Sequence, residues 1–378
     1  MNVRGTPYRT VWLEGRTVRL IDQRVLPHAF EILGCPTFRE TAQAIQTMAV
    51  RGAGAIGAAA GYAVAQAALE AADGALVPFV QHAAQVIRAT RPTAHDLFYA
   101  VEQVQRAVEG APTAEAARAA AVARAGRLAD ENAAAGEAIG RIGAPLLREG
   151  MRVLTHCNAG WLAFADWGSA LAPIYCAHRT GMRLFVYVAE TRPRSQGAKL
   201  TAWELSQEGV PHVIVADTAV GSRFQRGEID AVIVGADRIA ANGDVVNKIG
   251  TYTVALLARH HGVPFYVAAP RSTFDATLAD GSLIPIEERD PEEVLYVTGL
   301  SDCGTVERVR VADAASSAQN PAFDLTPASL VTRLITEEGL LEPTTKAIGR
   351  WLHRPAVQRT RPRASAPTDT PATRPQAR

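Results

Sequence analysis

The chain has few of the residues and spacings that mark disulfide-stabilised or metal-binding proteins. Its 378 residues include only four cysteines, at positions 35, 157, 176 and 303, and these form no CxxC pair. They therefore do not indicate a thiolate metal site. The nine histidines show neither HxxxH nor HExxH spacing, so the sequence gives no support for zinc. We expect reduced thiols and no bound metal.

Long apolar runs and an excess of charge of one sign are also missing. The first residues, Met1 to Gly5, contain no apolar signal core, and no run is long enough to span a bilayer. The formal net charge is only +1, which gives no reason to expect nucleic acid or an anionic membrane as a partner. With its reduced thiols, the protein is expected to be cytoplasmic.

The chain does have enough apolar material for a large core. Hydrophobic residues make up 48% and charged residues 20%, both globular values, and the length favours two domains. Apolar and polar residues alternate from Thr10 to Ile21 around Glu14-Gly15, which predicts a β-hairpin. An amphipathic helix is expected over Thr41 to Ala49. An alanine-rich, mainly helical region follows over residues 58–148, with breaks near 73–74, 91–92 and 112.

From Met151 onward, predicted strands alternate with predicted helices. The strands are expected at Arg152–Leu154, Arg183–Val188, His212–Ala216, Ala231–Val234 and Pro264–Ala268. The helices are expected at Leu162–Ala177, Lys199–Glu208 and Tyr252–His260. Such alternation predicts a parallel, Rossmann-like sheet that is covered on both faces.

The expected fold class is therefore α/β. A smaller, mainly helical N-terminal domain with a β-hairpin is assigned to residues 1–130, and a Rossmann-like catalytic domain to residues 131–350. Residues 354–378 are rich in proline and arginine and have hardly any large apolar side chains. Such a segment cannot bury enough surface to order itself, so we expect a disordered tail.

A thiol and a carboxylate are placed where two predicted strands end. Cys157 follows the strand that begins near Met151, and Asp237 follows Ala231–Val234. Ligands of open α/β sheets bind outside the carboxyl ends of the strands, so these two groups are expected in one pocket. We also expect a helix to begin after Cys157, with a dipole that favours the thiolate. The alternatives are a buried structural cysteine and an aspartate that only caps a helix.

Several loops carry groups suited to a phosphate or to sugar hydroxyls. The glycine-rich segment 51–57 offers close backbone approach, helix N–H groups and the guanidinium of Arg51, although it matches neither a Walker A loop nor the dinucleotide fingerprint. Segment 190–197 carries two arginines and Gln196, and Asn247-Lys248 follows a turn. Arg91 would supply another anion contact. Helix packing by small residues and an ordinary solvated loop are the alternatives, but together these loops predict a small phosphorylated ligand.

Read in order, these segments resemble the methylthioribose-1-phosphate isomerases, enzymes of methionine salvage. The resemblance covers roughly residues 9–343. The matching stretches are Leu20–Arg24, Val50–Gly57, Arg91–Ala94, Thr155–Gly160, Glu190–Pro193, Gln196–Ala198, Leu200–Leu205, Gly235–Tyr252, Ala268–Pro270, Ile284–Val294 and Asn320–Asp324.

The resemblance implies an aldose–ketose isomerase that converts 5-methylthioribose 1-phosphate to 5-methylthioribulose 1-phosphate. It implies Cys157 and Asp237 as the catalytic pair, a homodimer, and no metal or nucleotide cofactor. The substrate contacts that it implies are Arg51, Gly52, Ala53, Arg91, Gln196, Asn247 and Lys248. The same superfamily contains other sugar-phosphate isomerases, including those of 5-deoxyribose 1-phosphate. It also contains non-catalytic regulatory subunits of a translation-initiation exchange factor, which are expected to lack the Cys/Asp pair.

The sequence departs from the family pattern in two places. The family usually carries Val-Asn where this chain has His95-Asp96, and an aromatic residue where it has Arg194. Both departures lie beside expected substrate contacts. They leave the reaction class unchanged and put the 5-substituent of the sugar in question.

Overall fold

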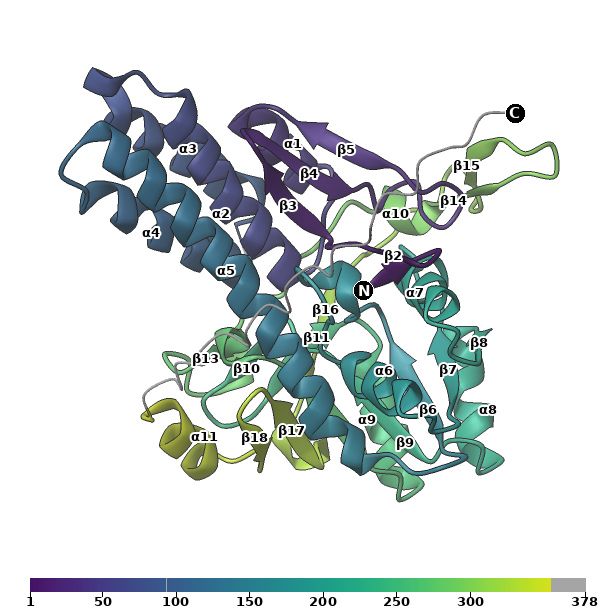
Figure 1. Ribbon diagram of the computed structural model, residues 1–378. Coiled ribbons are helices and arrows are strands. Elements are labelled where there is room, and N and C mark those ends of the chain that lie inside the picture. Colours follow the sequence, from purple (N-terminus) through teal and green to yellow (C-terminus); the bar gives the residue numbers. More distant parts are fainter. Residues whose placement is uncertain (93, 355–378) are drawn as a thin grey trace, which may run out of the picture.

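The computed structural model of the chain describes residues 1–92 and 94–354, so the tail predicted from residue 354 lies outside them except for its first residue. The fold is α/β, as expected. A group of helices with a small sheet forms the N-terminal part, and a seven-stranded sheet with helices forms the C-terminal part (Figure 1).

The N-terminal part begins with short antiparallel strands, β1 (Asn2–Val3) and β2 (Thr6–Pro7). A three-stranded antiparallel sheet follows: β3 (Val11–Glu14), β4 (Thr17–Ile21) and β5 (Ile32–Cys35). Glu14 pairs with Thr17 across the turn, which confirms the predicted hairpin. The helices are α1 (Phe38–Gln46), α2 (Ala53–Glu70), α3 (Leu76–Thr90), α4 (His95–Glu109) and α5 (Ala114–Gly143).

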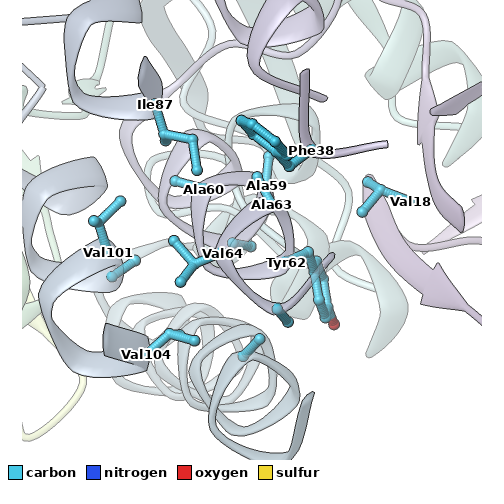
Figure 2. Packing of buried hydrophobic residues seen from close by; sticks show 14 of the residues in the cluster. Val18, Phe38, Ala59, Ala60, Tyr62, Ala63, Val64, Ile87, Val101 and Val104 are labelled. Atoms are coloured by element: carbon cyan, nitrogen blue, oxygen red, sulfur yellow. The ribbon is translucent and has the colours of Figure 1, made fainter. Parts of the chain in front are cut away.

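Helix α2 is the centre of the N-terminal part. Every residue from Gly54 to Ala68 is buried, as expected for a helix that is apolar on all sides. Figure 2 shows Val64 of α2 facing Val101 and Val104 of α4, with Ile87 of α3 nearby. Because most α2 side chains are alanine or glycine, the neighbouring helices pack closely around it.

The C-terminal part is built on one large sheet. Its strand order is β18-β17-β12-β9-β6-β7-β8, parallel except for β18. The bounds are β6 (Arg152–His156), β7 (Phe185–Ala189), β8 (His212–Val215), β9 (Ala231–Val234), β12 (Phe265–Ala268), β17 (Arg333–Thr336) and β18 (Gly339–Leu341). All five strands predicted from the sequence are therefore confirmed, and β17 and β18 were missed.

Two apolar clusters cover the two faces of this sheet. One contains residues of α5, α6 (Ala172–Arg179) and α7 (Ala202–Gln207). The other contains residues of α8 (Val220–Gln225), α9 (Thr251–His260) and α11 (Thr345–Leu352). The predicted Rossmann-like arrangement is confirmed by this layering.

The helix predicted over Leu162–Ala177 is wrong for its first half. A 3₁₀ turn spans Trp161–Ala163, and α6 begins only at Ala172. Trp167 (φ +67°) and Gly168 (φ +80°) lie in the left-handed region, which a right-handed helix cannot include. The intervening loop instead packs against Gly160 and Gly136.

The segment after Asp237 forms strands. β10 (Arg238–Ala240) and β11 (Val245–Lys248) make a hairpin. They join β13 (Phe274–Asp275) and β16 (Phe323–Thr326) in a second, four-stranded sheet. A short helix, α10 (Glu292–Leu295), then leads into a projecting hairpin of β14 (Tyr296–Leu300) and β15 (Val306–Arg310) (Figure 1).

Helix α5 joins the two parts of the molecule. One stretch packs on α2 and α4, and the other packs on α6 and β17. The domain boundary expected at residues 130/131 falls inside this helix and stays a prediction. None of the helices in the described ranges is long and apolar enough to cross a bilayer.

Candidate active site

The expected catalytic residues lie at one edge of the large sheet. Cys157 directly follows β6, and Asp237 follows β9 by three residues. Because β9 and β6 are parallel neighbours, their carboxyl ends meet at the same edge. The Lys248 ammonium influences the pKa of both side chains. The structure thus brings together the thiol, the carboxyl and a cation.

Solvent reaches part of each of these three side chains. Cys157 and Lys248 are half-buried and Asp237 is exposed, yet protein atoms surround all three closely enough to shift their pKa values by desolvation. The three groups are therefore accessible to a small ligand at this edge of the sheet.

The backbone around Cys157 is held by two threonines. Cys157 has φ +65°, its N–H donates to Thr191 Oγ1 at 2.8 Å, and its carbonyl accepts from Thr201 Oγ1 at 2.6 Å. Thr191 follows β7, and Thr201 precedes α7. The left-handed conformation of a non-glycine residue is kept because these neighbours fix both of its peptide groups.

The expectation of a helix dipole at Cys157 is wrong. The chain runs from Cys157 into an irregular loop and then into the 3₁₀ turn. Burial raises the pKa of the Cys157 thiol, Lys248 and Arg51 oppose this shift, and Asp237 adds to it. The resting side chain is therefore a thiol, and the nearby cations are the groups that favour its thiolate.

The surroundings of Asp237 favour its protonated form more than water does. Burial raises its pKa, while Lys248, Arg51 and Arg91 act in the opposite direction. Its backbone N–H donates to the carbonyl of Val246 at 2.9 Å. The helix-capping alternative is excluded because strand β10 begins at the next residue.

The glycine-rich segment forms the entry to α2. Arg51 is buried and donates from Nη1 to Asn158 Oδ1 and from Nη2 to the Asn158 carbonyl at 2.7 Å. Gly52 is the N-cap with φ +89°, and α2 begins at Ala53 with no side-chain cap among the described residues. A Cβ on Gly52 would lie 2.5 Å from Cα and Cβ of Ala163. The free N–H groups of this helix start are suited to an anion.

Two of the remaining expected contacts carry a buried polar atom without a hydrogen-bond partner among the described residues. Arg91 Nη1 and Gln196 Oε1 are buried and have no hydrogen-bond partner in the described part of the chain. Asn247 is buried and donates to Thr251 Oγ1 at 3.0 Å, and the Lys248 ammonium lies 4.6 Å from the centre of the Phe323 ring. Buried polar atoms without partners are rare, so they indicate where a polar ligand binds.

The sequence reasoning missed a group of alternating charges beside Arg91. Arg91 Nη2 lies 3.8 Å from Glu287, Arg289 contacts Glu287 at 3.1 Å and Glu293 at 2.6 Å, and Arg194 contacts Glu293 at 2.7 Å. Burial by itself would raise the pKa of Glu293, but Arg289 and Arg194 lower it to about 2. The acidic stretch 287–293, with Arg289 as its one basic residue, was the available signal.

A cavity of about 330 Å³ adjoins these charges. It is lined by Gln46, Met48, Thr90, Arg91, Pro92, Glu287 and Arg289. Neither of the two departures from the family pattern lines this cavity. Arg194 is engaged with Glu293, while Asp96 is buried at the start of α4 with Ser272 Oγ at 3.5 Å, and it raises the pKa of the adjacent His95.

Comparisons with known proteins show the family of the chain. The model of the initiation factor 2 subunit family matches residues 49–343. A protein of Acidiphilium cryptum named methylthioribose-1-phosphate isomerase is 50% identical over 95% of this chain and 99% of its own length. A protein of Methylocella silvestris with the same name is 48% identical over 92% of this chain and 97% of its own length.

Two solved structures are also similar. The 5-methylthioribose 1-phosphate isomerase from Pyrococcus horikoshii OT3 has a TM-score of 0.82 and 40% identity, with 93% of this chain and 99% of that one covered. A structure described as translation initiation factor eIF-2B, subunit delta, from A. fulgidus has a TM-score of 0.78 and 41% identity, with 89% and 96% covered. The chain belongs to the initiation factor 2 subunit family and, within it, groups with the methylthioribose-1-phosphate isomerases.

Proposed function

We propose that this chain isomerises 5-methylthioribose 1-phosphate to 5-methylthioribulose 1-phosphate in methionine salvage. The observation that carries the proposal is the placement of Cys157 and Asp237 at one edge of the sheet, where the charges of Lys248 and Arg51 act on both. Relatives about half identical over nearly their whole length are named for this reaction. The Cys/Asp pair also separates the chain from the non-catalytic members expected in the superfamily.

Asp237 is proposed as the general acid. In an aldose 1-phosphate the aldehyde carbon is locked in a ring and phosphorylated, so no free carbonyl is present to acidify the C2 hydrogen. The ring oxygen must gain a proton as its bond to C1 breaks. Burial raises the pKa of Asp237, which favours the protonated carboxyl that this step requires.

Cys157 is proposed to act at the C2 and C1 carbons. In one route its thiolate, favoured by Lys248 and Arg51, takes the C2 proton and returns it to C1 through an enediol-like intermediate. In the other route a hydride moves directly from C2 to C1, and Cys157 stabilises the transition state. Incorporation of solvent deuterium at C1 distinguishes the routes because a directly transferred hydride does not exchange.

The substrate phosphate and hydroxyls are proposed to bind to the start of α2 and to the polar side chains around it. The start of α2 at Gly52 and Ala53, together with Arg51 and Arg91, is suited to the phosphate. Gln196, Asn247 and Lys248 are proposed to complete the substrate contacts. Such contacts are remote from the C2 hydrogen, so their binding energy can orient the sugar for reaction.

A second candidate is the same reaction on 5-deoxyribose 1-phosphate. It is favoured by Arg194, which places an ion pair with Glu293 where the family usually has an aromatic residue. A single apolar group distinguishes the two substrates and is worth only about 1–3 kcal/mol. The ratio of their kcat/KM values decides between them. A homodimer, as the resemblance implies, is also proposed, and sedimentation of the purified protein tests it.

Turnover by the wild type and by Asp237→Asn is the test of the proposed function. The wild type is expected to convert methylthioribose 1-phosphate to the ketose without added metal. Asp237→Asn is expected to lower kcat by roughly 10²–10⁴-fold, since the amide cannot deliver the proton.

Asp230→Asn is the matched control for this test. Asp230 pairs with Arg152 at the opposite end of the same strands, so its loss should leave kcat unchanged. A folded wild type without turnover, or an Asp237→Asn variant with wild-type kcat, would contradict the proposal.

A further inference from the structure

Glu204 is a fully buried carboxylate behind the active site. It lies in the first turn of α7 and has 0% exposure. Its Oε1 accepts from Asn158 Nδ2 at 2.8 Å and from the Leu162 N–H at 3.1 Å, and its Oε2 accepts from the Trp161 N–H at 2.8 Å and from the Tyr175 hydroxyl at 2.7 Å. All four partners are neutral donors, and the ionised carboxylate accepts from all of them with its two oxygens.

The first connection from Glu204 to the substrate site passes through Asn158. The Asn158 amide donates to Glu204 from Nδ2 and accepts from Arg51 at Oδ1. Asn158 Nδ2 also donates to Thr201 Oγ1 at 3.1 Å, and Thr201 in turn holds the Cys157 carbonyl. Glu204 therefore sets the orientation of the amide that holds the Arg51 guanidinium.

The second connection passes through the 3₁₀ turn Trp161–Ala163. Glu204 accepts the N–H groups of Trp161 and Leu162, which begin this turn. Ala163 closes the turn and packs directly against Gly52 at the start of α2. One carboxylate thus supports both Arg51, through Asn158, and the start of α2, through the turn that packs against Gly52. Arg51 and the start of α2 are the two features suited to the substrate phosphate.

The Glu204 carboxylate is packed tightly against the backbone of Gly160. A Cβ on Gly160 would collide with Glu204 Oε2, so the loop passes the carboxylate at a residue that lacks a side chain. Burial raises the pKa of Glu204 to about 7, although its four hydrogen bonds oppose the shift. Without the carboxylate, the N–H groups of Trp161 and Leu162 and the hydroxyl of Tyr175 would lose their acceptor, which would cost free energy.

We propose that Glu204 is a positioning residue that aligns Arg51 and the start of α2 for the phosphate of the substrate. The inference rests on the proposed function, which supplies the sugar phosphate. Glu204 itself contacts neither substrate nor the reacting carbons. Its effect is therefore expected on substrate affinity through Arg51 and less on the chemical step.

The experiment is a double-mutant cycle of Glu204→Gln and Arg51→Lys with kcat and KM measured for methylthioribose 1-phosphate. In the wild-type background, Glu204→Gln places an NH₂ group against N–H and O–H donors. We expect KM to rise at least about 10-fold while kcat changes less. In the Arg51→Lys background the same change should raise KM less than about 2-fold, because the bidentate contact to Asn158 is already lost.

Two further variants keep the result independent of folding. Glu337→Gln removes another partly buried carboxylate, which accepts the Arg271 N–H beyond the end of β17, three strands away from β6 in the sheet. It should lower thermal stability and leave KM unchanged. Asn158→Ala removes the connection and keeps Glu204, so it should reproduce the rise in KM even where Glu204→Gln does not fold.

Binding of inorganic phosphate separates failure of this inference from failure of the proposed function. If the wild type does not turn over methylthioribose 1-phosphate, the proposed function fails, and calorimetric phosphate affinity of the wild type and Glu204→Gln still tests the positioning role. An unchanged KM and phosphate affinity in folded Glu204→Gln would overturn the inference. Equal effects of the substitution in both Arg51 backgrounds would also overturn it, because a purely structural role is additive.

Discussion

At the scale of single residues, Glu204 makes stability depend on pH. Its pKa rises from an ordinary 4.5 to about 7 in the folded chain. Between these values the folded state keeps a proton that the unfolded state releases, so the free energy of unfolding falls as pH rises. The displacement corresponds to about 3 kcal/mol. This stabilisation is fully present below about pH 4.5 and is lost as pH rises through about 7.

We therefore expect Glu204→Gln to flatten the pH dependence of unfolding between pH 5 and pH 7.5. Urea midpoints of the wild type and the variant at both pH values measure the difference. Asp324, whose pKa burial raises to about 6, contributes a slope of the same sign to both proteins and so cancels in the comparison. Parallel pH profiles for the two proteins would show that Glu204 does not titrate in this range.

The sequence predicted that Cys157 and Asp237 lie close together, but it did not predict the buried contacts of Glu204 that position the neighbouring loop. Cys157 and Asp237 were placed together because strand ends of a parallel sheet share one edge, and the structure agrees. The thiolate prediction was wrong because it assumed a helix that does not form. Glu204 gave no signal, since a glutamate in a short polar helix normally faces solvent. Its burial depends on a loop that folds around it from 40 residues earlier in the chain.

At the scale of elements, the start of α2 requires a glycine. Gly52 has φ +89° and packs against Ala163. In Gly52→Ala, a residue with a Cβ would have to adopt this positive φ, which costs roughly 1–2 kcal/mol. Its Cβ would also collide with the backbone of Ala163. We expect a lower unfolding temperature and at least about a 10-fold higher KM for the sugar phosphate, measured by calorimetry and kinetics.

Gly126→Ala is the matched control for the helix start. Gly126 lies inside α5, and nothing is within 4 Å of its added Cβ, so the substitution should stabilise by roughly 0.5–1 kcal/mol with KM unchanged. A Gly52→Ala variant with wild-type KM would show that the helix start does not bind the phosphate.

Elements with a strong local pattern were predictable, and those defined by partners were not. The hairpin β3–β4 and strands β6, β7, β8, β9 and β12 carry apolar runs of four or five residues or an alternating pattern. Strands β10, β13 and β18 have two or three residues each, too few for a periodic signal. Their conformation comes from neighbours that are distant in the sequence.

At the scale of the whole molecule, the site depends on both parts of the chain. The loop that follows Cys157 is held from the N-terminal part: Thr10 Oγ1 donates to the Trp161 carbonyl at 2.7 Å, and Gln23 Nε2 donates to the Leu162 carbonyl at 2.7 Å. Helix α5 packs on both cores. The helical part and the sheet are therefore expected to unfold together, although the sequence alone had indicated two separate domains.

Phe38→Ala tests whether the helical part and the sheet unfold together, by a change in the core of the N-terminal part. Phe38 is fully buried and meets Phe79 edge-on at 5.7 Å, so its truncation should cost roughly 3–5 kcal/mol. We expect the unfolding midpoints from far-ultraviolet circular dichroism and from tryptophan fluorescence to fall by the same amount, because Trp161 and Trp203 report on the sheet. Val77→Ala, at an exposed position of α3, should leave both midpoints unchanged. If only the helical signal shifts in Phe38→Ala, the two parts unfold independently, and α5 does not couple them.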